Sequence, residues 1–265
     1  MMSLVAGLVL WHLAAAAPAP LVSYYYEATT TQSPAGKAEP QVSKMKAWVD
    51  GPRARIEFVG GGAKGAYPEG SYVVTKDGGE TVIFVNPKKQ AFARWELDDV
   101  VRDVADRLKN EGGMVRLELT DVSNEKLLEE ASQPILGFEA THRKWRSGYT
   151  MKYAILGIDQ VRREDTVRDL WFSDRIAGSG YDALLQPGRL KTGHAELDKV
   201  VAGRIGEPHG FTLRSETVTK VRKGKGAEQT LKSRTDVTLL RQETADASRF
   251  VVPSGYVEKP FKKAR

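Results

Sequence analysis

Apolar and polar residues alternate in short runs between residues 44 and 96. The runs KMKAWVD at 44–50 and RARIEFV at 53–59 carry an apolar residue at every second position. Turn signals follow the runs at Asp50-Gly51-Pro52, at 76–79 and at 86–89. Alternation with period two is typical of strands between a core and solvent, and tight turns join antiparallel neighbours. The stretch therefore predicts an antiparallel meander.

Two later segments change to the helical period, which predicts helices at 97–111 and 194–205. Their apolar stripes are Leu97, Val100, Val101, Val104 and Leu108 in the first, and Leu197, Val200, Val201 and Ile205 in the second. Acidic residues follow the start of the first helix, as the helix dipole favours. Thr192 is the predicted cap of the second, and 181–186 is a candidate for a third, short helix.

The remaining segments return to strand patterns, which gives about ten to twelve strands in total. We expect a turn at Arg146-Ser147-Gly148 between strands 139–145 and 149–156. Residues 124–133 fit either a helical turn or a continuing strand. Short links favour pairing in sequence order, and so large a sheet curls. The expected fold is mainly β: a curved antiparallel sheet, or half-open barrel, with two or three helices over its concave face.

The N-terminus is typical of a secretory signal. Residues 4–17 read LVAGLVLWHLAAAA, too short to span a bilayer comfortably, and end in an A-x-A cleavage pattern. A buried N-terminal helix is the alternative, which the strand-like SYYY at 23–26 disfavours. We therefore predict a signal peptide at 1–19, a single domain at 20–260 and a basic tail at 261–265. The mature chain would be periplasmic or secreted, without a transmembrane segment.

Composition narrows the function classes. The chain has no cysteine, which excludes disulfides, thiolate metal sites and a lipid-anchored cysteine. The formal net charge of +6 is spread along the chain without an arginine-rich block, so we expect no nucleic-acid partner.

The sequence shows no catalytic motif. The four histidines lack metal-ligand spacing, and Gly178-Ser179-Gly180 lacks the flanks of a nucleophile elbow. The glycine-rich GGGAKG at 60–65 leads into another strand, unlike a phosphate loop. We expect no cofactor and no enzyme activity; a hydrolase is the less favoured alternative.

Three stretches resemble the LolA-like superfamily of periplasmic lipoprotein carriers: the meander from Tyr72 to Phe92, the ILGFEAT at 135–141 and the closing FVVPSGY at 250–256. The resemblance covers roughly residues 23–260 as an order of elements. It implies a half-open barrel whose helices lie over a concave, apolar face, which in the carriers holds acyl chains. The carriers' cavity arginine has four candidates here, none of them singled out: Arg53, Arg55, Arg94 and Arg116.

Large apolar residues of the predicted strands are either core or the walls of a ligand cavity, since both environments demand inward apolar residues. The candidates for cavity walls are Ile56, Phe58, Ile83, Trp95, Leu117, Tyr153 and Trp171. The first hypothesis is a carrier for a hydrophobic or acylated ligand, with an anionic head group favoured by the basic surface. The second is an envelope protein-binding or sensor module with a filled interior.

Overall fold

The computed structural model describes residues 20–33, 39–60, 68–110, 115–155, 158–181, 190–205 and 209–260. It gives the backbone but no side chains for 104–110, 115–117, 154–155, 158–159 and 204–205. The predicted signal peptide, most of the glycine-rich loop, the third helix after Tyr181 and the basic tail lie outside the described residues.

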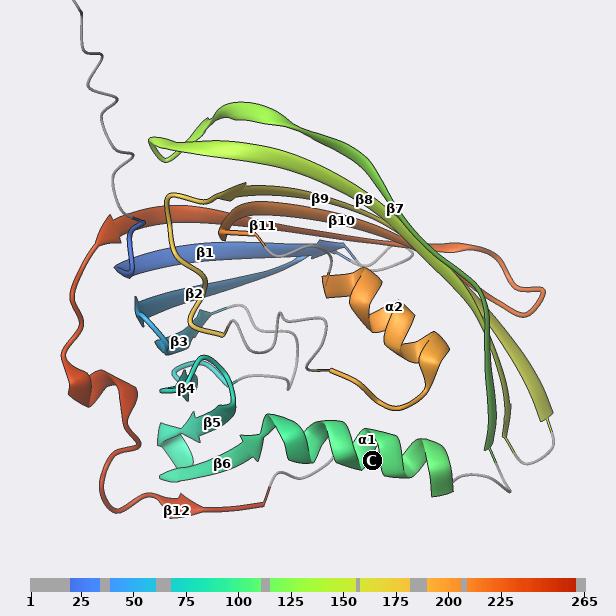
Figure 1. The fold of residues 1–265 in the computed structure, drawn as a ribbon. Coiled ribbons are helices and arrows are strands. Elements are labelled where there is room, and N and C mark those ends of the chain that lie inside the picture. The colour runs from blue at the N-terminus through green and yellow to red at the C-terminus, as the bar shows by residue number, and fades with distance from the viewer. Residues whose placement is uncertain are drawn as a thin grey trace, which may run out of the picture.

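One sheet contains all the strands of the described part of the chain. They are β1 (Ser23–Ser33), β2 (Gln41–Asp50), β3 (Arg53–Gly60), β4 (Tyr72–Thr75), β5 (Thr81–Asn86), β6 (Ala91–Glu96), β7 (Val115–Ile135), β8 (Phe138–Ile155), β9 (Ile158–Ser173), β10 (Phe211–Lys223), β11 (Gln229–Gln242) and β12 (Val257–Glu258). Figure 1 shows that the sheet arches over its concave side and stays open.

The strand order is β12-β6-β5-β4-β3-β2-β1-β11-β10-β9-β8-β7. Two meanders, β1–β6 and β7–β11, thus each pair in sequence order, and the antiparallel β1–β11 pair joins them. The short β12 pairs with β6 in parallel. The predicted fold class, a curved antiparallel sheet that does not close, is confirmed.

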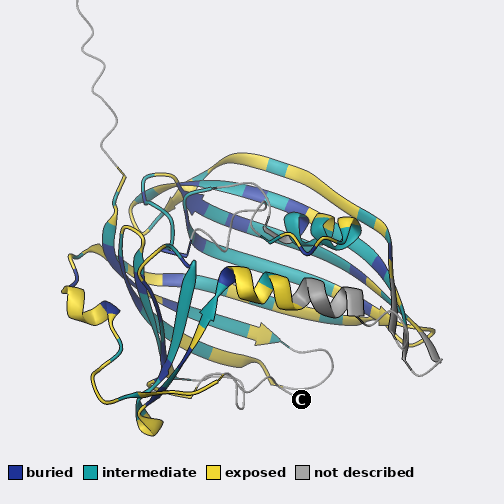
Figure 2. Ribbon diagram, turned by 60° about the horizontal axis from the view of Figure 1, so that its bottom comes forward, coloured by how far each residue is buried: buried dark blue, intermediate teal, exposed yellow. Residues whose placement is uncertain are grey.

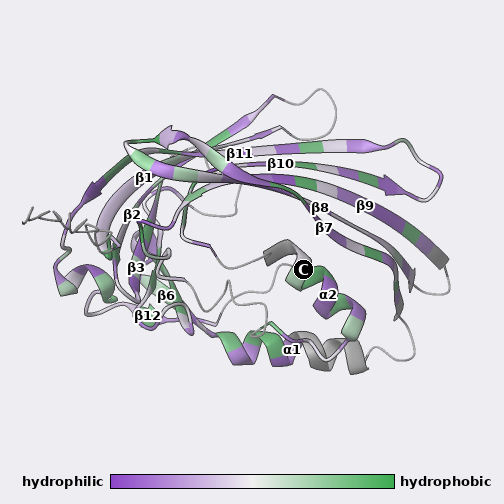
Figure 3. Cartoon of the chain, turned by 45° about the horizontal axis from the view of Figure 1, so that its top comes forward, coloured by the Kyte–Doolittle hydropathy of each residue, from purple (hydrophilic) through white to green (hydrophobic). Residues whose placement is uncertain are grey.

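Two α-helices lie on the concave side of the sheet (Figure 3). α1 (Leu97–Asn110) continues directly from β6, and α2 (Ala195–Ile205) packs against β7 and β8. Two 3₁₀ turns complete the elements of the described part of the chain: η1 (Pro87–Lys89) and η3 (Ala247–Phe250). The start of α2 differs from the prediction, because His194 Nδ1 accepts the Leu197 N–H at 3.4 Å, while the Thr192 hydroxyl donates to Asp198 at 2.8 Å.

The expected turn at 146–148 is wrong. β8 passes straight through these residues, and the turn lies at Leu136–Gly137, between β7 and β8. Gly148 serves a close approach instead: a Cβ there would lie 3.3 Å from both the Glu164 carbonyl oxygen and Ser123 Oγ. A glycine inside a strand often marks such an approach. Residues 124–133, the ambiguous stretch, belong to β7.

Apolar clusters cover both faces of the sheet. The inner cluster, on the concave face, consists of Tyr24, Tyr26, Ala28, Ala47, Val49, Ala54, Ala140, Ile176, Tyr181, Phe211, Leu213 and Val237. The outer cluster consists of Tyr25, Trp48, Tyr72, Val74, Val85, Ala245 and Phe250, so the segment after β11 covers part of the convex face. In Figure 2 the buried segments gather mostly toward one end of the sheet, called here the closed end. The opposite end, which holds the tips of β7–β11, is the open end.

Candidate ligand-binding groove

A groove runs along the concave face at the open end, between the sheet and α2. One cavity of about 380 Å³ is lined by Trp145, Ser147, Arg162, Glu164, Thr166, Arg168, Gly203, Thr217, Thr219 and Leu231. A neighbouring cavity of about 280 Å³ shares Thr217, Thr219 and Leu231 with it and extends to Gln32 and Ser233. Together they form the inner groove, which crosses five strands from β8 to β1.

Strand register brings hydroxyl-bearing residues together in this groove. Thr166 lies opposite Thr219, with 3.1 Å between their hydroxyl oxygens, and Thr30 lies opposite Thr235, with 2.9 Å between theirs. A hydroxyl that is already hydrogen-bonded to a neighbour leaves the threonine methyl group as a contact surface. The lining is therefore mixed, with methyl groups, Trp145 and Leu231 beside polar atoms.

An ion pair with a buried carboxylate lies at the β9 wall of the groove. Glu164 is 7% exposed, and its Oε2 accepts hydrogen bonds from the Tyr149 hydroxyl at 2.9 Å and from Arg162 Nη2 at 2.8 Å. These bonds offset the cost of removing the carboxylate from water. Arg162 Nε is also buried and has no hydrogen-bond partner among the described residues. The Arg162 side chain as a whole is 37% exposed, so the rest of its guanidinium is available to a ligand in the groove.

α2 forms the roof of the groove. Lys199, Val200 and Gly203 face Ser147 and Thr166 across a small cavity of about 10 Å³. Gly203 permits this approach, because a Cβ there would lie 3.1 Å from the Asn124 side chain. The helix therefore lies close to the sheet at Gly203 and leaves the larger cavities on the side of β9, β10 and β11.

The closed end of the concave face contains packed core. The Tyr24 hydroxyl donates to the carbonyl oxygens of Ala177 and Gly178, at 3.1 and 2.6 Å, which fixes the segment after β9 onto the sheet. Phe211 contacts the rings of Tyr24 and Tyr26 edge to face, at centroid distances of 5.3 and 4.9 Å. Burial raises the pKa of Tyr26 to about 12 and also raises the pKa of Tyr181.

The structure divides the predicted wall residues between the two faces. Ile56 packs against the inner cluster. Phe58 lies two residues further along β3 and is the strand partner of Met45, and Trp95 is the strand partner of Val82. Met45 and Val82 are partly buried residues that pack against the inner cluster. Tyr153 alternates in phase with Ser147 and Tyr149, so it also faces inward toward the open end. Leu117 pairs with Tyr153, but its side chain lies outside the described part.

Ile83 and Trp171 lie apart from the others, on the convex face. Ile83 packs against the outer cluster, beneath the C-terminal segment. Trp171 stacks on His142, with ring centroids 4.4 Å apart and 2° between the planes, and His142 Nε2 lies 2.8 Å from Asp169. A single cavity therefore cannot hold all seven predicted residues.

The sequence prediction missed the residues that line the inner groove. Threonine is not a residue type that by itself predicts a binding site, so Thr166, Thr217 and Thr219 were not selected. Hydroxyl residues at alternate positions of long strands could have indicated a sheet face that is neither apolar core nor charged surface. Three of the four candidate arginines also lie elsewhere. Arg53 pairs with Asp50, the Arg55 guanidinium lies 3.6 Å from the Tyr72 ring centroid, and Arg94 lies 3.8 Å from Glu258. The Arg116 side chain is outside the described part.

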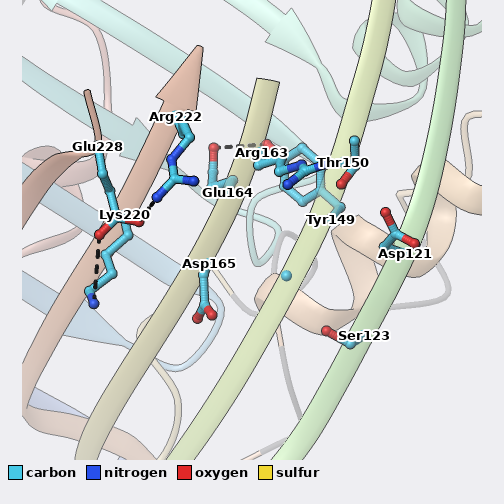
Figure 4. A pocket seen from close by; sticks show the side chains of 11 residues that line it. Asp121, Ser123, Tyr149, Thr150, Arg163, Glu164, Asp165, Lys220, Arg222 and Glu228 are labelled. Atoms are coloured by element: carbon cyan, nitrogen blue, oxygen red, sulfur yellow. Dashed lines mark hydrogen bonds and ion pairs between the residues drawn. The ribbon is translucent and has the colours of Figure 1, made fainter. Parts of the chain in front are cut away.

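Two other hollows suit a ligand less well. One, of about 330 Å³, lies on the convex face between β7 and β10 and mixes acidic with basic side chains, among them Asp121, Asp165, Lys220 and Arg222 (Figure 4). A wider one, of about 740 Å³, lies at the closed end between Pro20 and Thr244. Neither has a helix over it or a continuous apolar wall among its lining residues.

The described residues offer no group of three or more His, Asp or Glu side chains that could hold a metal ion. Within the same part of the chain, neither helix is long and apolar enough to cross a bilayer.

No family model and no curated protein matches the chain. It is similar in structure to a LolA superfamily protein from Nitrosomonas europaea, with 9% identity, a TM-score of 0.32 and coverage of 88% of this chain and 91% of the other. It is also similar to a domain named for outer-membrane lipoprotein sorting from Vibrio parahaemolyticus, with 8% identity, a TM-score of 0.30 and coverage of 86% and 88%. The solved structures similar to this chain thus include a member of the superfamily that its sequence resembles. At these values the likeness carries no argument about function.

Proposed function

We propose that this protein is a non-catalytic periplasmic or secreted carrier that holds a hydrophobic, acyl-chain or lipoprotein-like ligand in the inner groove. The observation that carries the proposal is the contrast along one concave face. The closed end is filled by the inner cluster, whereas adjoining cavities of about 380 and 280 Å³ lie at the open end near α2.

The concave face changes character from strand to strand. Ile56 and Phe58 give β3 an apolar surface, and hydroxyls dominate from β1 to β10. Arg162 and Glu164 add charge on β9. From β3 to β9 there are five inter-strand steps in the sheet order, which span about 24 Å along the curve. This surface suits an amphiphile whose apolar part points toward β3 and whose polar part points toward β9.

The energetics support binding of such a chain. Each CH₂ group removed from water contributes about 0.8 kcal/mol, so a partly covered acyl chain would bind with useful affinity. The sheet and α2 already line opposite sides of the cavity, so a bound chain would contact protein on both sides without movement of the helix.

The test is direct. The purified mature protein should carry extractable lipid, and after delipidation it should bind a fluorescent fatty-acid analogue. Thr217→Trp would fill the space that both cavities share and should abolish uptake. Val218→Trp is the matched control, because Val218 is the next residue on the same strand and faces the opposite side. Absence of lipid and of dye binding, or equal loss in both variants, would contradict the proposal.

A protein-binding or sensor role is the second candidate. The 21-residue β7 is the edge strand of the sheet, and an exposed edge can pair with a strand of a partner. Three register shifts and Pro134 interrupt it, as in edges that avoid pairing. Capture of an envelope protein that Thr217→Trp does not disturb, and that a proline in β7 abolishes, would favour this role.

A further inference from the structure

The tips of β9 and β10 form a basic cluster at the open end of the groove. This basic tip consists of Arg162, Arg163, Lys220, Arg222, Lys223 and Lys225. Residues 162–165 and 220–228 together hold six basic and three acidic residues. The excess of three positive charges is half of the chain's formal net charge of +6, concentrated in 13 of its 265 residues.

Strand register places like charges opposite each other at this tip. Arg162 pairs with Lys223, and Arg163 pairs with Arg222. Like charges directly opposite each other destabilise an antiparallel pair. Two consecutive pairs of this kind, one on each face, are an unfavourable arrangement that a bound anion would relieve.

The nearby carboxylates do not neutralise the tip. Glu164 accepts from Arg162, and Asp165 pairs with Arg146 on β8, which is outside the tip. Glu228 lies 3.7 Å from Lys220 and 3.4 Å from Arg222 (Figure 4). This leaves Arg163, Lys223 and Lys225 without a carboxylate partner among the described residues.

Arg162 connects the tip to the groove. Its side chain lines the 380 Å³ cavity, and its buried Nε has no hydrogen-bond partner among the described residues. Lys223 lies beside it on the same face of the sheet. The exposed part of the Arg162 guanidinium and the exposed Lys223 ammonium group thus lie together at the end of the groove.

We propose that Arg162 and Lys223, with Lys225 in the adjoining turn, bind a phosphate group at the β9–β10 end of the inner groove. Guanidinium and ammonium groups together bind the several oxygens of a phosphate through charge-assisted hydrogen bonds. The phosphate is either the head group of the bound amphiphile or free phosphate. Binding of a head-group phosphate rests on the proposed function, because it requires the acyl chain in the groove. Binding of free phosphate does not rest on it.

The experiment compares two amphiphiles with the same acyl chain, a lysophosphatidic acid and the corresponding monoacylglycerol, together with inorganic phosphate alone. Dissociation constants are measured by calorimetry on the delipidated full-length mature protein, at low and high salt. We expect the phosphate amphiphile to bind about tenfold more tightly than the neutral one, with the difference reduced by salt.

Two charge-removing variants and one control locate the site. Arg162→Gln should reduce the preference for the phosphate amphiphile over the neutral one to less than about threefold. Arg162 pairs with the buried Glu164, so a loss of folding in this variant would leave the site untested. The exposed Lys223→Gln/Lys225→Gln double variant provides the same test without touching that pair. Lys88→Gln/Lys89→Gln removes the same charge at η1, on the other meander, and should change nothing.

Each outcome has a definite meaning. Equal affinity for the two amphiphiles overturns the phosphate site and leaves the carrier proposal intact. A third outcome is that inorganic phosphate binds, that neither amphiphile binds, and that Lys223→Gln/Lys225→Gln abolishes phosphate binding. This outcome supports the site with free phosphate as its source and contradicts the carrier proposal. Retention of the protein on vesicles of anionic lipid, without transfer of labelled lipid into it, overturns the site in favour of a membrane-docking surface.

Discussion

The closed and open ends of the concave face belong to one sheet but carry different side chains. At the closed end, Tyr24 and Tyr26 of β1 and Leu213 of β10 are 0 to 5% exposed and belong to one cluster. At the open end of β10, alternate positions carry Thr217 and Thr219, which line cavities. Threonine side chains are too small to fill the space between the curved sheet and α2. The same strand, β10, is therefore core at one end and groove wall at the other.

The largest test of this difference is removal of side-chain volume on one strand. Leu213→Ala should lower the free energy of unfolding by about 2–5 kcal/mol, because it leaves a cavity among residues that cannot relax. Thr217→Ala, four residues along β10, should lower it by less than about 1 kcal/mol. Urea unfolding measures both. Similar losses would mean that the two ends are packed alike.

High pH should weaken the closed end through its buried tyrosine. Because the pKa of Tyr26 is raised to about 12 from 10.0, the folded state keeps the phenol proton at pH values where the unfolded chain loses it. The contribution of the protonated Tyr26 to the free energy of unfolding is complete below pH 10 and is lost as the pH rises toward about 12. The loss is about 1.4 kcal/mol per pH unit in that window. Unfolding curves from pH 9 to 12 should show this slope, and Tyr26→Phe should reduce it by that amount; an unchanged slope would contradict the assignment.

A glycine where the closed end meets the segment after β9 offers a third test. Gly180 has φ +71°, and a Cβ there would lie 2.6 Å from Ala54 Cβ. Gly180→Ala should therefore destabilise the protein by about 2 kcal/mol, through backbone strain and displacement of the inner cluster. Gly193→Ala is the control: its φ of +78° is similar, but nothing lies within 4 Å of the added Cβ. Thermal unfolding should separate the two, and equal shifts would assign the whole effect to backbone strain.

The smallest expected effect concerns the open end alone. Thr217→Val replaces a hydroxyl by a methyl group of similar size on the groove wall and should change the free energy of unfolding by less than about 0.5 kcal/mol. It should strengthen binding of a neutral amphiphile by about fourfold, as one additional apolar group would. Dye titration measures the affinity. A weaker affinity would show that the hydroxyl bonds to the ligand and that this wall is polar in function.

The alternation of apolar residues predicts strands, and the change of period at Leu97 and His194 predicts helices, because both patterns are local. The register between strands is not local. Ile56 and Ile83 are equivalent in a sequence pattern, yet one packs on the inner cluster and the other on the outer. Apolar clusters cover both faces of this sheet, so an apolar side chain does not reveal which face it occupies.

Local patterns in the sequence predict the class of fold, the order of the strands within each meander and the positions of the two helices. The contacts between the two meanders and the positions of side chains on the two faces depend on the tertiary structure. It joined the meanders through β1 and β11, carried β8 straight through Gly148, and placed threonines from distant strands around one groove. It also brought Arg162 opposite Lys223. These outcomes depend on which residues of distant strands become neighbours, and hydrogen bonding and packing across the whole sheet fix that choice.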